Sequence, residues 1–355
     1  MKQKCRIKGI LLGTAVGDSV GLPAEGIARK RNQRMFKGKW HQRLFFGYGM
    51  ISDDTEHSIF VAQCLLACGD DEQIFLKRLA WCLKWWLVSL PAGVGLATLK
   101  SIIRLWLGVS PLKSGVYSAG NGVAMRSSII GGYFADNIVK LDDFVTLSTR
   151  ITHSDPRALI GARSIAHITA WIIREDLQEC PDIDELEIML RLVEDTETEW
   201  LNLVNKIIYS LKQGLSVIEF AESIGQKKGI SGYIYHTVPM AIYAWYQHFD
   251  NFQEALEAVF NCGGDTDTTG AITGALCGAT LGESAIPQSW RQKILEYPRN
   301  IKLLEKIGDK LTENINNNYQ KSSPVNYHWW WILPRNLLFL IIVLTHGFRR
   351  LLPPF

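Results

Sequence analysis

Apolar residues recur at the spacing of α-helices along most of this chain. Phe75, Leu79, Cys82 and Trp86, for example, fall on one face of a helix. No two segments alternate convincingly between apolar and polar residues, as half-exposed β-strands do. The pattern therefore predicts an all-α fold, with further helices over residues 94–107, 122–134, 141–151, 156–174, 184–193, 199–213, 238–248, 252–260, 268–281, 288–296 and 300–314.

The helical part of the chain is expected to form one domain. Clusters of glycine, proline, serine and aspartate separate the helices, and no repeat period indicates a solenoid. The composition changes near residue 318, where a polar stretch begins and an aromatic and aliphatic segment follows it. We therefore expect a domain over residues 1–318, and a polar linker with a short hydrophobic C-terminal tail over residues 319–355.

Composition limits the classes of protein to consider. Of the 355 residues, 47% are hydrophobic and 21% are charged, which is typical of a folded globular chain. The net charge of +3 gives no reason to expect nucleic acid as a partner. Seven cysteines without paired spacing argue against a disulfide framework and favour the cytosol. The basic N-terminus resembles a signal peptide, but Asp18 interrupts its apolar stretch.

One local charge pattern is stronger than the overall balance. Between Glu25 and Asp53 there are seven basic residues and no acidic residue. A solvated loop is the simpler interpretation of this run. The alternative is a surface for phosphates or for an acidic partner, since the run lies between two candidate site segments.

The first candidate site segment is an aspartate-rich turn at residues 49–55, directly ahead of an apolar helix. It contains Ser52, Asp53 and Asp54. Serine, aspartate and threonine are also the preferred residues at the start of a helix. Helix capping is therefore the simpler explanation when this turn is considered alone.

A second aspartate-rich turn, at residues 262–270, contains Asp265, Asp267 and Thr268. Small residues at every fourth position of the following helix would let another backbone pack closely and hold the turn rigidly. Capping with close packing is again the alternative. Together, the two turns supply four carboxylates and nearby hydroxyls, which suit hard divalent cations such as Mg²⁺. No cluster of His or Cys competes for zinc.

Three further segments carry polar groups. Gly120-Asn121-Gly122 is a glycine-rich turn whose N–H groups suit phosphate or sugar oxygens, although ordinary turns use the same residues. His153 precedes another helix, and a core histidine is the alternative there. Glu25 follows a helix rich in small residues. It is either an exposed loop acid or a residue close to a metal or to the bond that is cut.

In this order and spacing, the five segments resemble the ADP-ribosylglycohydrolase family, the group that contains the dinitrogenase reductase-activating glycohydrolases. The resemblance spans residues 6 to about 300. It rests on Gly-Gly-Asp-Thr-Asp-Thr at 263–268, Ser-Asp-Asp-Thr at 52–55, Gly-Asn-Gly-x-Ala-Met-Arg at 120–126 and Thr-His-Ser-Asp-Pro at 152–156. It implies a compact, orthogonally packed all-α domain with two Mg²⁺ ions, or Mn²⁺, at the base of a cleft.

The resemblance also implies roles for single residues. Each ion would be held by one of the two turns, through Ser52, Asp53 and Asp54 or through Asp265, Asp267 and Thr268. Asp53 or Asp54 would complete deprotonation of a water, and Glu25 would act at the metal centre or in substrate entry. The substrate would be bound by Gly120, Asn121, Gly122, His153, Gly232 and Tyr233.

Enzymes of this family cut the bond between the anomeric carbon of ADP-ribose and a modified side chain, through an oxocarbenium-like transition state. An ADP-ribosylated protein is therefore the expected partner. The alternatives are a catalytically silent ADP-ribose-binding or protein-interaction scaffold, or hydrolysis of another nucleoside-linked molecule. The retained aspartates favour the enzyme. Ala119 replaces the aromatic residue that stacks on adenine in some members, which leaves Tyr117, Tyr233 and Tyr235 as candidates.

The tail lies outside the resemblance. Its uninterrupted apolar run, residues 337–344, is roughly 12 Å long as a helix, against a hydrocarbon core of about 30 Å. A longer span would include Arg335, which disfavours crossing a membrane. We expect this tail, with its three tryptophans, to lie in the interface of an anionic membrane or to pack on the catalytic domain or a second subunit. The protein is thus expected in the cytoplasm, with membrane association through the tail as one outcome.

Overall fold

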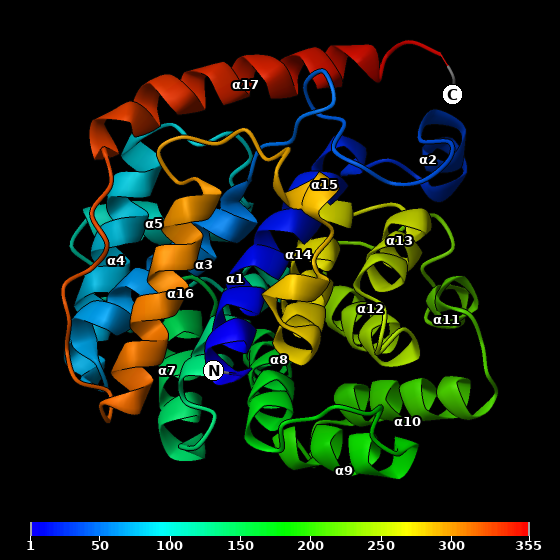
Figure 1. The fold of residues 1–355 in the computed structure, drawn as a ribbon, viewed down its shortest axis with the longest axis horizontal. Helices are drawn as coiled ribbons and strands as arrows, with labels where there is room; N and C mark the ends of the chain where they lie inside the picture. Colours follow the sequence, from blue (N-terminus) through cyan, green and yellow to red (C-terminus); the bar gives the residue numbers. More distant parts are fainter. Residues whose placement is uncertain (1, 354–355) are drawn as a thin grey trace.

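The computed structural model describes residues 2–353, and over that range helices are joined by turns and loops (Figure 1). Strand-like pairing in these residues is limited to isolated bridges, such as the one between Gly120 and Tyr233. The all-α prediction is therefore confirmed.

Two helices in direct backbone contact form the centre of the fold. α1 (Lys2–Gly21) runs antiparallel to α14 (Thr266–Leu281). Gly13 faces Gly274 and Gly17 faces Gly270 so closely that a Cβ on any of them would overlap a carbonyl oxygen of the facing helix. Because these glycines are four residues apart, one face of each helix is bare backbone. The close packing predicted for the helix after the second aspartate-rich turn is therefore present, with α1 as its neighbour.

The other helices surround this pair (Figure 1). Those that contact α1 or α14 directly include α3 (Asp53–Cys68), α6 (Ser128–Tyr133), α8 (Pro156–Arg174), α12 (Ile234–Gln247), α13 (Phe252–Cys262), α15 (Gln288–Arg291) and α16 (Ile301–Asn316). Further from the centre lie α2 (Arg29–Met35), α4 (Glu72–Val88), α5 (Leu96–Trp106), α7 (Ile138–Arg150), α9 (Ile183–Val193), α10 (Thr198–Lys212) and α11 (Val217–Ser223).

Most helices agree with the predicted ranges, but three predictions are wrong in part. The range 122–134 is divided into a 3-10 helix (Asn121–Arg126) and α6. The range 288–296 is helical only as far as Arg291. The helix predicted from residue 238 begins earlier, at Ile234. Pro239 therefore lies inside α12 and not at its start.

The basic run is not simply a solvated loop, as its simpler interpretation supposed. Residues 29–35 form α2. Arg29 is buried and donates hydrogen bonds to the carbonyl oxygens of Cys262 (3.3 Å) and Gln226 (2.8 Å), and it pairs with Glu222 (2.8 Å). This arginine therefore anchors α2 beside the second aspartate-rich turn, while Lys30, Lys37 and Lys39 are exposed.

The segment after α16 is packed against the domain. Ser322 N donates to Leu66 O (2.8 Å), and the Gln63 side chain exchanges two hydrogen bonds of 2.8 Å with the backbone of Val325. The tail then forms a single helix, α17 (Ile332–Arg349), across one edge of the molecule (Figure 1). The apolar run at 337–344 is thus the middle of a longer helix.

The inner face of α17 is fixed to the domain by polar and apolar contacts. Arg335 pairs with Glu296 through two hydrogen bonds of 2.8 and 2.7 Å, and Asn336 Nδ2 donates to Ser89 O (2.7 Å). Phe339 and Ile342 are buried in a cluster with Leu22, Leu44, Met50 and Ala92. The polar residues that disfavour a membrane span therefore face the protein.

Candidate active site

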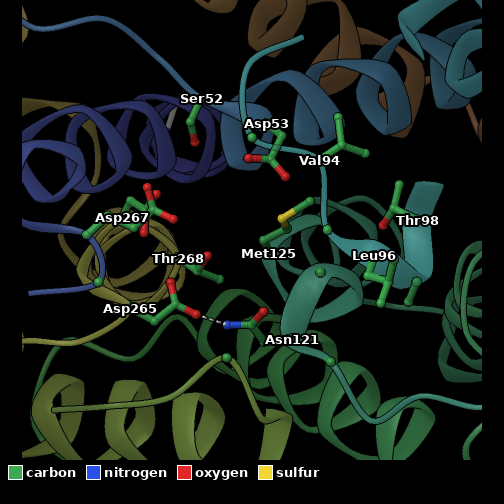
Figure 2. A pocket seen from close by; sticks show the side chains of 18 of the residues that line it. Ser52, Asp53, Val94, Leu96, Thr98, Asn121, Met125, Asp265, Asp267 and Thr268 are labelled. Atoms are coloured by element: carbon green, nitrogen blue, oxygen red, sulfur yellow. Dashed lines mark hydrogen bonds between the residues drawn. The ribbon is translucent and has the colours of Figure 1, made fainter. Parts of the chain in front are cut away.

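A cleft of about 730 Å³ opens where the two aspartate-rich turns meet (Figure 2). Apart from Asp54 and Tyr233, all the predicted site residues line it. The loop before α5 (residues 92–95) and the first turn of that helix (residues 96–98) form another part of the wall. The sequence pattern predicted a helix from residue 94 here and did not indicate that this segment belongs to the site.

The first turn is held at the start of α3 by a buried acid from α1. Ser52 is the N-cap residue of α3, and its hydroxyl accepts from Asp54 N (3.3 Å). Asp18 Oδ2 accepts from Ser52 N (2.8 Å), from Thr55 N (3.2 Å) and from the Thr55 hydroxyl. Ser52 therefore caps α3, and this does not exclude a role of the same turn in the site. Asp18 was not predicted as a site residue.

The second turn is held at the start of α14 by backbone pairing on both sides. Gly263 and Gly264 have φ values of 68° and 84°, which favour glycine. Gly264 exchanges hydrogen bonds with Gly26 N (2.7 Å) and Ile27 O (2.8 Å), and Asp265 N donates to Ile230 O (2.8 Å). This pairing brings Glu25 and the Gly232 loop to the same cleft.

Two contacts connect the segments across the cleft. The hydroxyls of Ser52 (3.2 Å) and Thr268 (3.3 Å) both lie within hydrogen-bond distance of Asp54 Oδ2, which joins the two turns. Asp265 Oδ2 accepts from Asn121 Nδ2 (2.6 Å), which ties the glycine-rich turn to α14 (Figure 2). The structure therefore brings together three of the segments that the sequence singled out.

The crowding of carboxylates changes their protonation. Burial, followed by neighbouring acids, raises the pKa of Asp53, Asp54 and Asp267 well above the ordinary value. Burial raises the pKa of Asp18 to about 6, although its hydrogen bonds to Thr55 and Ser52 oppose this. All these groups therefore hold protons more readily than solvated aspartates do.

Around the two turns, three buried carboxylate oxygens have no hydrogen-bond partner within the described residues: Asp18 Oδ1, Asp54 Oδ1 and Asp267 Oδ1. Within the same residues, no three His, Cys, Asp or Glu side chains converge closely enough to form a complete cage. Mg²⁺ usually keeps several waters and uses one or two carboxylates, so it does not need such a cage. The donor set fits this kind of cation.

His153 lies against the glycine-rich turn in its neutral form. Its Nδ1 is 2.9 Å from the Thr152 hydroxyl, which accepts from Arg126 Nη2 (2.8 Å). Burial, together with the positive charge of Arg126, lowers the pKa of His153 to about 3. A Cβ on Gly120 would come within 3.1 Å of His153 Nε2, so glycine allows this close approach.

The tyrosines proposed to stack on adenine do not line this cleft. The Tyr233 hydroxyl donates to Glu199 (2.7 Å), which draws the side chain toward α10. Tyr235 is buried against Trp200, with its hydroxyl 3.1 Å from Glu197. Tyr117 is 74% exposed. Of the two predicted residues of this loop, Gly232 lines the cleft and Tyr233 does not.

The tail contributes to the cleft, which the sequence did not predict. Phe339 and Val343 of α17 line it. Arg350 Nη2 donates to Pro23 O (3.2 Å) near Glu25. The surface of Glu25 is exposed to solvent. Its pKa is nevertheless raised, first by reduced hydration and then by the charge of Asp265, while the charge of Arg350 opposes this rise.

The structure is thus an all-α fold with two acidic helix starts at one cleft, and comparison with known proteins identifies its family. The ADP-ribosylglycohydrolase family model matches residues 1–321. This chain belongs to that family and is a hydrolase of the ADP-ribosylglycohydrolase type.

Proteins similar to this chain come from organisms that differ widely from one another. An uncharacterized protein of Archaeoglobus fulgidus is 32% identical over 87% of this chain and 96% of its own length. The ADP-ribosyl-[dinitrogen reductase] glycohydrolase of Rhodospirillum rubrum is 27% identical, over 81% of this chain and 90% of its own. The ADP-ribosylhydrolase ARH3 of Gallus gallus is 25% identical, over 85% and 92%.

A solved structure shares the fold. It is described as an ADP-ribosylglycohydrolase-related protein complex, and it matches with a TM-score of 0.64 at 23% identity. The match covers 88% of this chain and 98% of the solved chain.

Proposed function

We propose that this chain is a magnesium-dependent hydrolase that releases ADP-ribose from a modified protein side chain. The main support is the convergence of Asp53, Asp54, Asp265 and Asp267, from two helix starts, around one cleft. The relatives from Rhodospirillum rubrum and Gallus gallus are named for ADP-ribosyl hydrolysis. The family membership and the geometry thus favour the same chemistry.

Two sets of side chains would hold the cations. They are Ser52, Asp53 and Asp54 on α3, and Asp265, Asp267 and Thr268 on α14. The unpartnered oxygens of Asp54 and Asp267 support this assignment, because a buried carboxylate oxygen needs a partner. Bound Mg²⁺ would supply contacts to ribose hydroxyls and make a nearby water more acidic, and Mn²⁺ would suit the same oxygen ligands.

Asp53 is better placed than Asp54 to accept a proton from the attacking water. Asp54 Oδ2 lies against two hydroxyls, and this residue does not line the cleft. Asp53 lines the cleft and points into it (Figure 2).

The reaction exchanges one bond at the anomeric carbon. The bond from this carbon to the side-chain atom breaks, and the water oxygen forms the new bond. One water proton passes to Asp53, which then releases it to solvent, and the leaving side-chain atom takes up one proton from solvent. Neutral His153 and the N–H groups near Gly120 and Gly122 would orient the substrate, since these residues line the same cleft.

The first prediction is that Asp53→Asn, Asp265→Asn and Asp267→Asn each lower turnover by on the order of 10² to 10⁴ while the helical fold is kept. Each change removes a charge from a crowded cluster and leaves the volume unchanged. The measurement is release of ADP-ribose from arginine-linked and serine-linked peptides with Mg²⁺, alongside circular dichroism. Asp195→Asn, on the exposed loop before α10, is the matched control.

Two results would contradict the proposal. Full turnover by Asp267→Asn would remove the support for two cation positions. Tight binding of ADP-ribose by the unaltered protein, without release from any linkage, would favour a silent binding scaffold of the same fold instead.

A further inference from the structure

We propose that α17 and the turn beside it form a docking surface for a bilayer of anionic phospholipid, with the helix lying flat in the interface. This inference concerns the outer face of the molecule and does not depend on the proposed hydrolysis. It rests on an uncovered apolar stripe, a neighbouring aromatic turn and the distribution of charge.

α17 has two apolar faces, and the domain covers only one of them. On the inner face, Phe339 and Ile342 are 2% and 6% exposed. On the other side an outer stripe of five residues is 45% to 69% exposed: Leu333, Leu337, Ile341, Leu344 and Phe348. The region Trp329–Arg349 is apolar and long enough to cross a membrane, yet only 22% of its apolar stretch of 18 residues is buried. A continuous exposed stripe of this size marks an interaction surface.

A tight turn extends this surface beside the helix. Phe45 and Tyr48 exchange two backbone hydrogen bonds of 2.9 Å, and Phe46 and Gly47 between them have φ values of 45° and 85°. This conformation is unfavourable for phenylalanine, and it leaves Phe46 89% exposed at the tip. Between the turn and α17 lies an apolar groove of about 340 Å³, lined by residues that include Phe45, Tyr48 and Leu338.

The charge around this surface favours an anionic partner. No acidic residue occurs between Glu25 and Asp53, and none follows Glu313. These two acid-free segments meet in the fold, because Arg31 donates to Arg350 O and His346 contacts Leu44 O. Lys30, Lys37, Lys39 and Arg349 are exposed on them. Lysine and arginine near an apolar surface attract the headgroups of anionic lipids.

Tryptophan placement supports a lipid interface more than a second copy of the chain. Trp329, Trp330 and Trp331 are each about half exposed or more, at the start of the helix. Tryptophan is enriched at the boundary between headgroups and acyl chains. Two copies that met through their stripes would also bring their basic segments together, which like-charge repulsion opposes.

The helix is expected to remain on the domain and not to cross the bilayer. Crossing would break the pairing of Arg335 with Glu296 and the bond from Asn336 to Ser89, and would place these polar groups in hydrocarbon. A flat orientation keeps both contacts and inserts only the outer stripe, the tryptophans and Phe46.

The test uses the full chain and sedimentation with phosphatidylcholine vesicles, with or without phosphatidylserine. We expect binding to the vesicles that contain phosphatidylserine, and a decrease at high salt. The double variant Ile341→Glu with Leu344→Glu should weaken binding at least about tenfold, because it buries two charges in the interface. Lys37→Glu should weaken it less, and only at low salt.

Matched variants on the opposite side of the molecule provide the controls. Ile188→Glu with Leu192→Glu changes two residues of α9 that are 60% and 75% exposed, and Lys206→Glu changes an exposed lysine of α10 (Figure 1). These variants should bind like the unaltered protein. Equal binding by the α17 and α9 double variants would overturn the proposal. So would a dimer in solution that dissociates in the α17 variant without any vesicle binding.

Discussion

The acidic residues of the cleft are not neutralised by the described protein groups around them. Asp18, Asp54 and Asp267 each bury one oxygen without a partner in the part of the chain that the structure describes. A buried, unpaired charge is unfavourable by several kcal/mol. The raised pKa values are one result of this crowding, because a proton relieves it. A metal ion bound as we propose would relieve it as well.

His153 gives a prediction about pH. Its pKa is about 3 in the folded protein and near 6.5 when solvated. The unfolded chain therefore binds the proton first as pH falls, so this stabilising contribution is complete above pH 6.5 and is lost toward pH 3. Relative to His153→Gln, the unaltered protein should lose up to about 1.4 kcal/mol of unfolding free energy per pH unit between pH 6 and 4. Denaturant unfolding at each pH measures this difference.

The control for this prediction is His41→Gln, because His41 is exposed. The comparison between variants is necessary, since Asp18 and its neighbours have raised pKa values and act in the opposite direction. A difference between the unaltered protein and His153→Gln that does not change with pH would mean that His153 is not held neutral by the fold.

At the residue scale, motifs were informative where neighbours in sequence build the site. The turns at 52–55 and 263–268 bring their own aspartates to the cleft. Asp18 could not be found in this way, because its role arises only where α1 meets the start of α3, 34 residues later in the chain. The direction of Tyr233 is set by Glu199 on another helix, also 34 residues away.

Among the elements, the contact between α1 and α14 controls the position of the second turn. A Cβ on Gly274 would overlap Gly13 O. We predict that Gly274→Ala lowers the unfolding free energy by about 3 kcal/mol and reduces turnover, since the helices must separate. Thermal or denaturant unfolding, with an activity assay, measures both effects.

Gly347→Ala is the control for this substitution. Gly347 is also helical, but no heavy atom lies within 4 Å of a Cβ built there. Alanine at that position should therefore raise helix stability by about 0.5–1 kcal/mol. Equal effects of the two substitutions would show that helix propensity, and not contact between α1 and α14, determines the result.

Arg335 connects α17 to the first turn. It pairs with Glu296 and donates to Ile51 O (2.5 Å), directly before Ser52. We predict that Arg335→Met lowers the unfolding free energy by about 3–5 kcal/mol, because Glu296 is then buried without its partner. The double variant with Glu296→Met should recover most of this loss. Arg349→Met, at an exposed position of the same helix, is the control.

The contrast between α8 and α17 shows what periodicity can predict about elements. α8 begins and ends at the predicted residues, because Asp155 caps it and its apolar spacing is regular. α17 was expected to be short, since Arg335, Asn336 and His346 interrupt the apolar run. Their partners Glu296, Ser89 and Leu44 are distant in sequence, so local patterning could not reveal that these residues face inward.

Over the whole molecule, the cleft is assembled from both ends of the chain. α1 supplies Asp18, the loop after it supplies Glu25, and α17 closes one wall with Phe339 and Val343. The family match ends at residue 321, before this wall begins. The motifs therefore identify the acidic base of the site, while the part of the wall that lies beyond the family match comes from the tail.

Removing the tail would separate the contribution of the two aspartate-rich turns from that of α17. A chain ending at Asn318 loses the partner of Glu296 and the cover of Leu22 and Met50, so its unfolding free energy should fall by about 3 kcal/mol or more. It retains all four aspartates of the two turns, so it should still release ADP-ribose from a small ADP-ribosyl substrate. Binding to the phosphatidylserine-containing vesicles should be lost. Calorimetry, turnover and vesicle sedimentation on the same preparation distinguish these effects. A well-folded but inactive truncation would show that the α17 wall is needed to build the site as well as to close it.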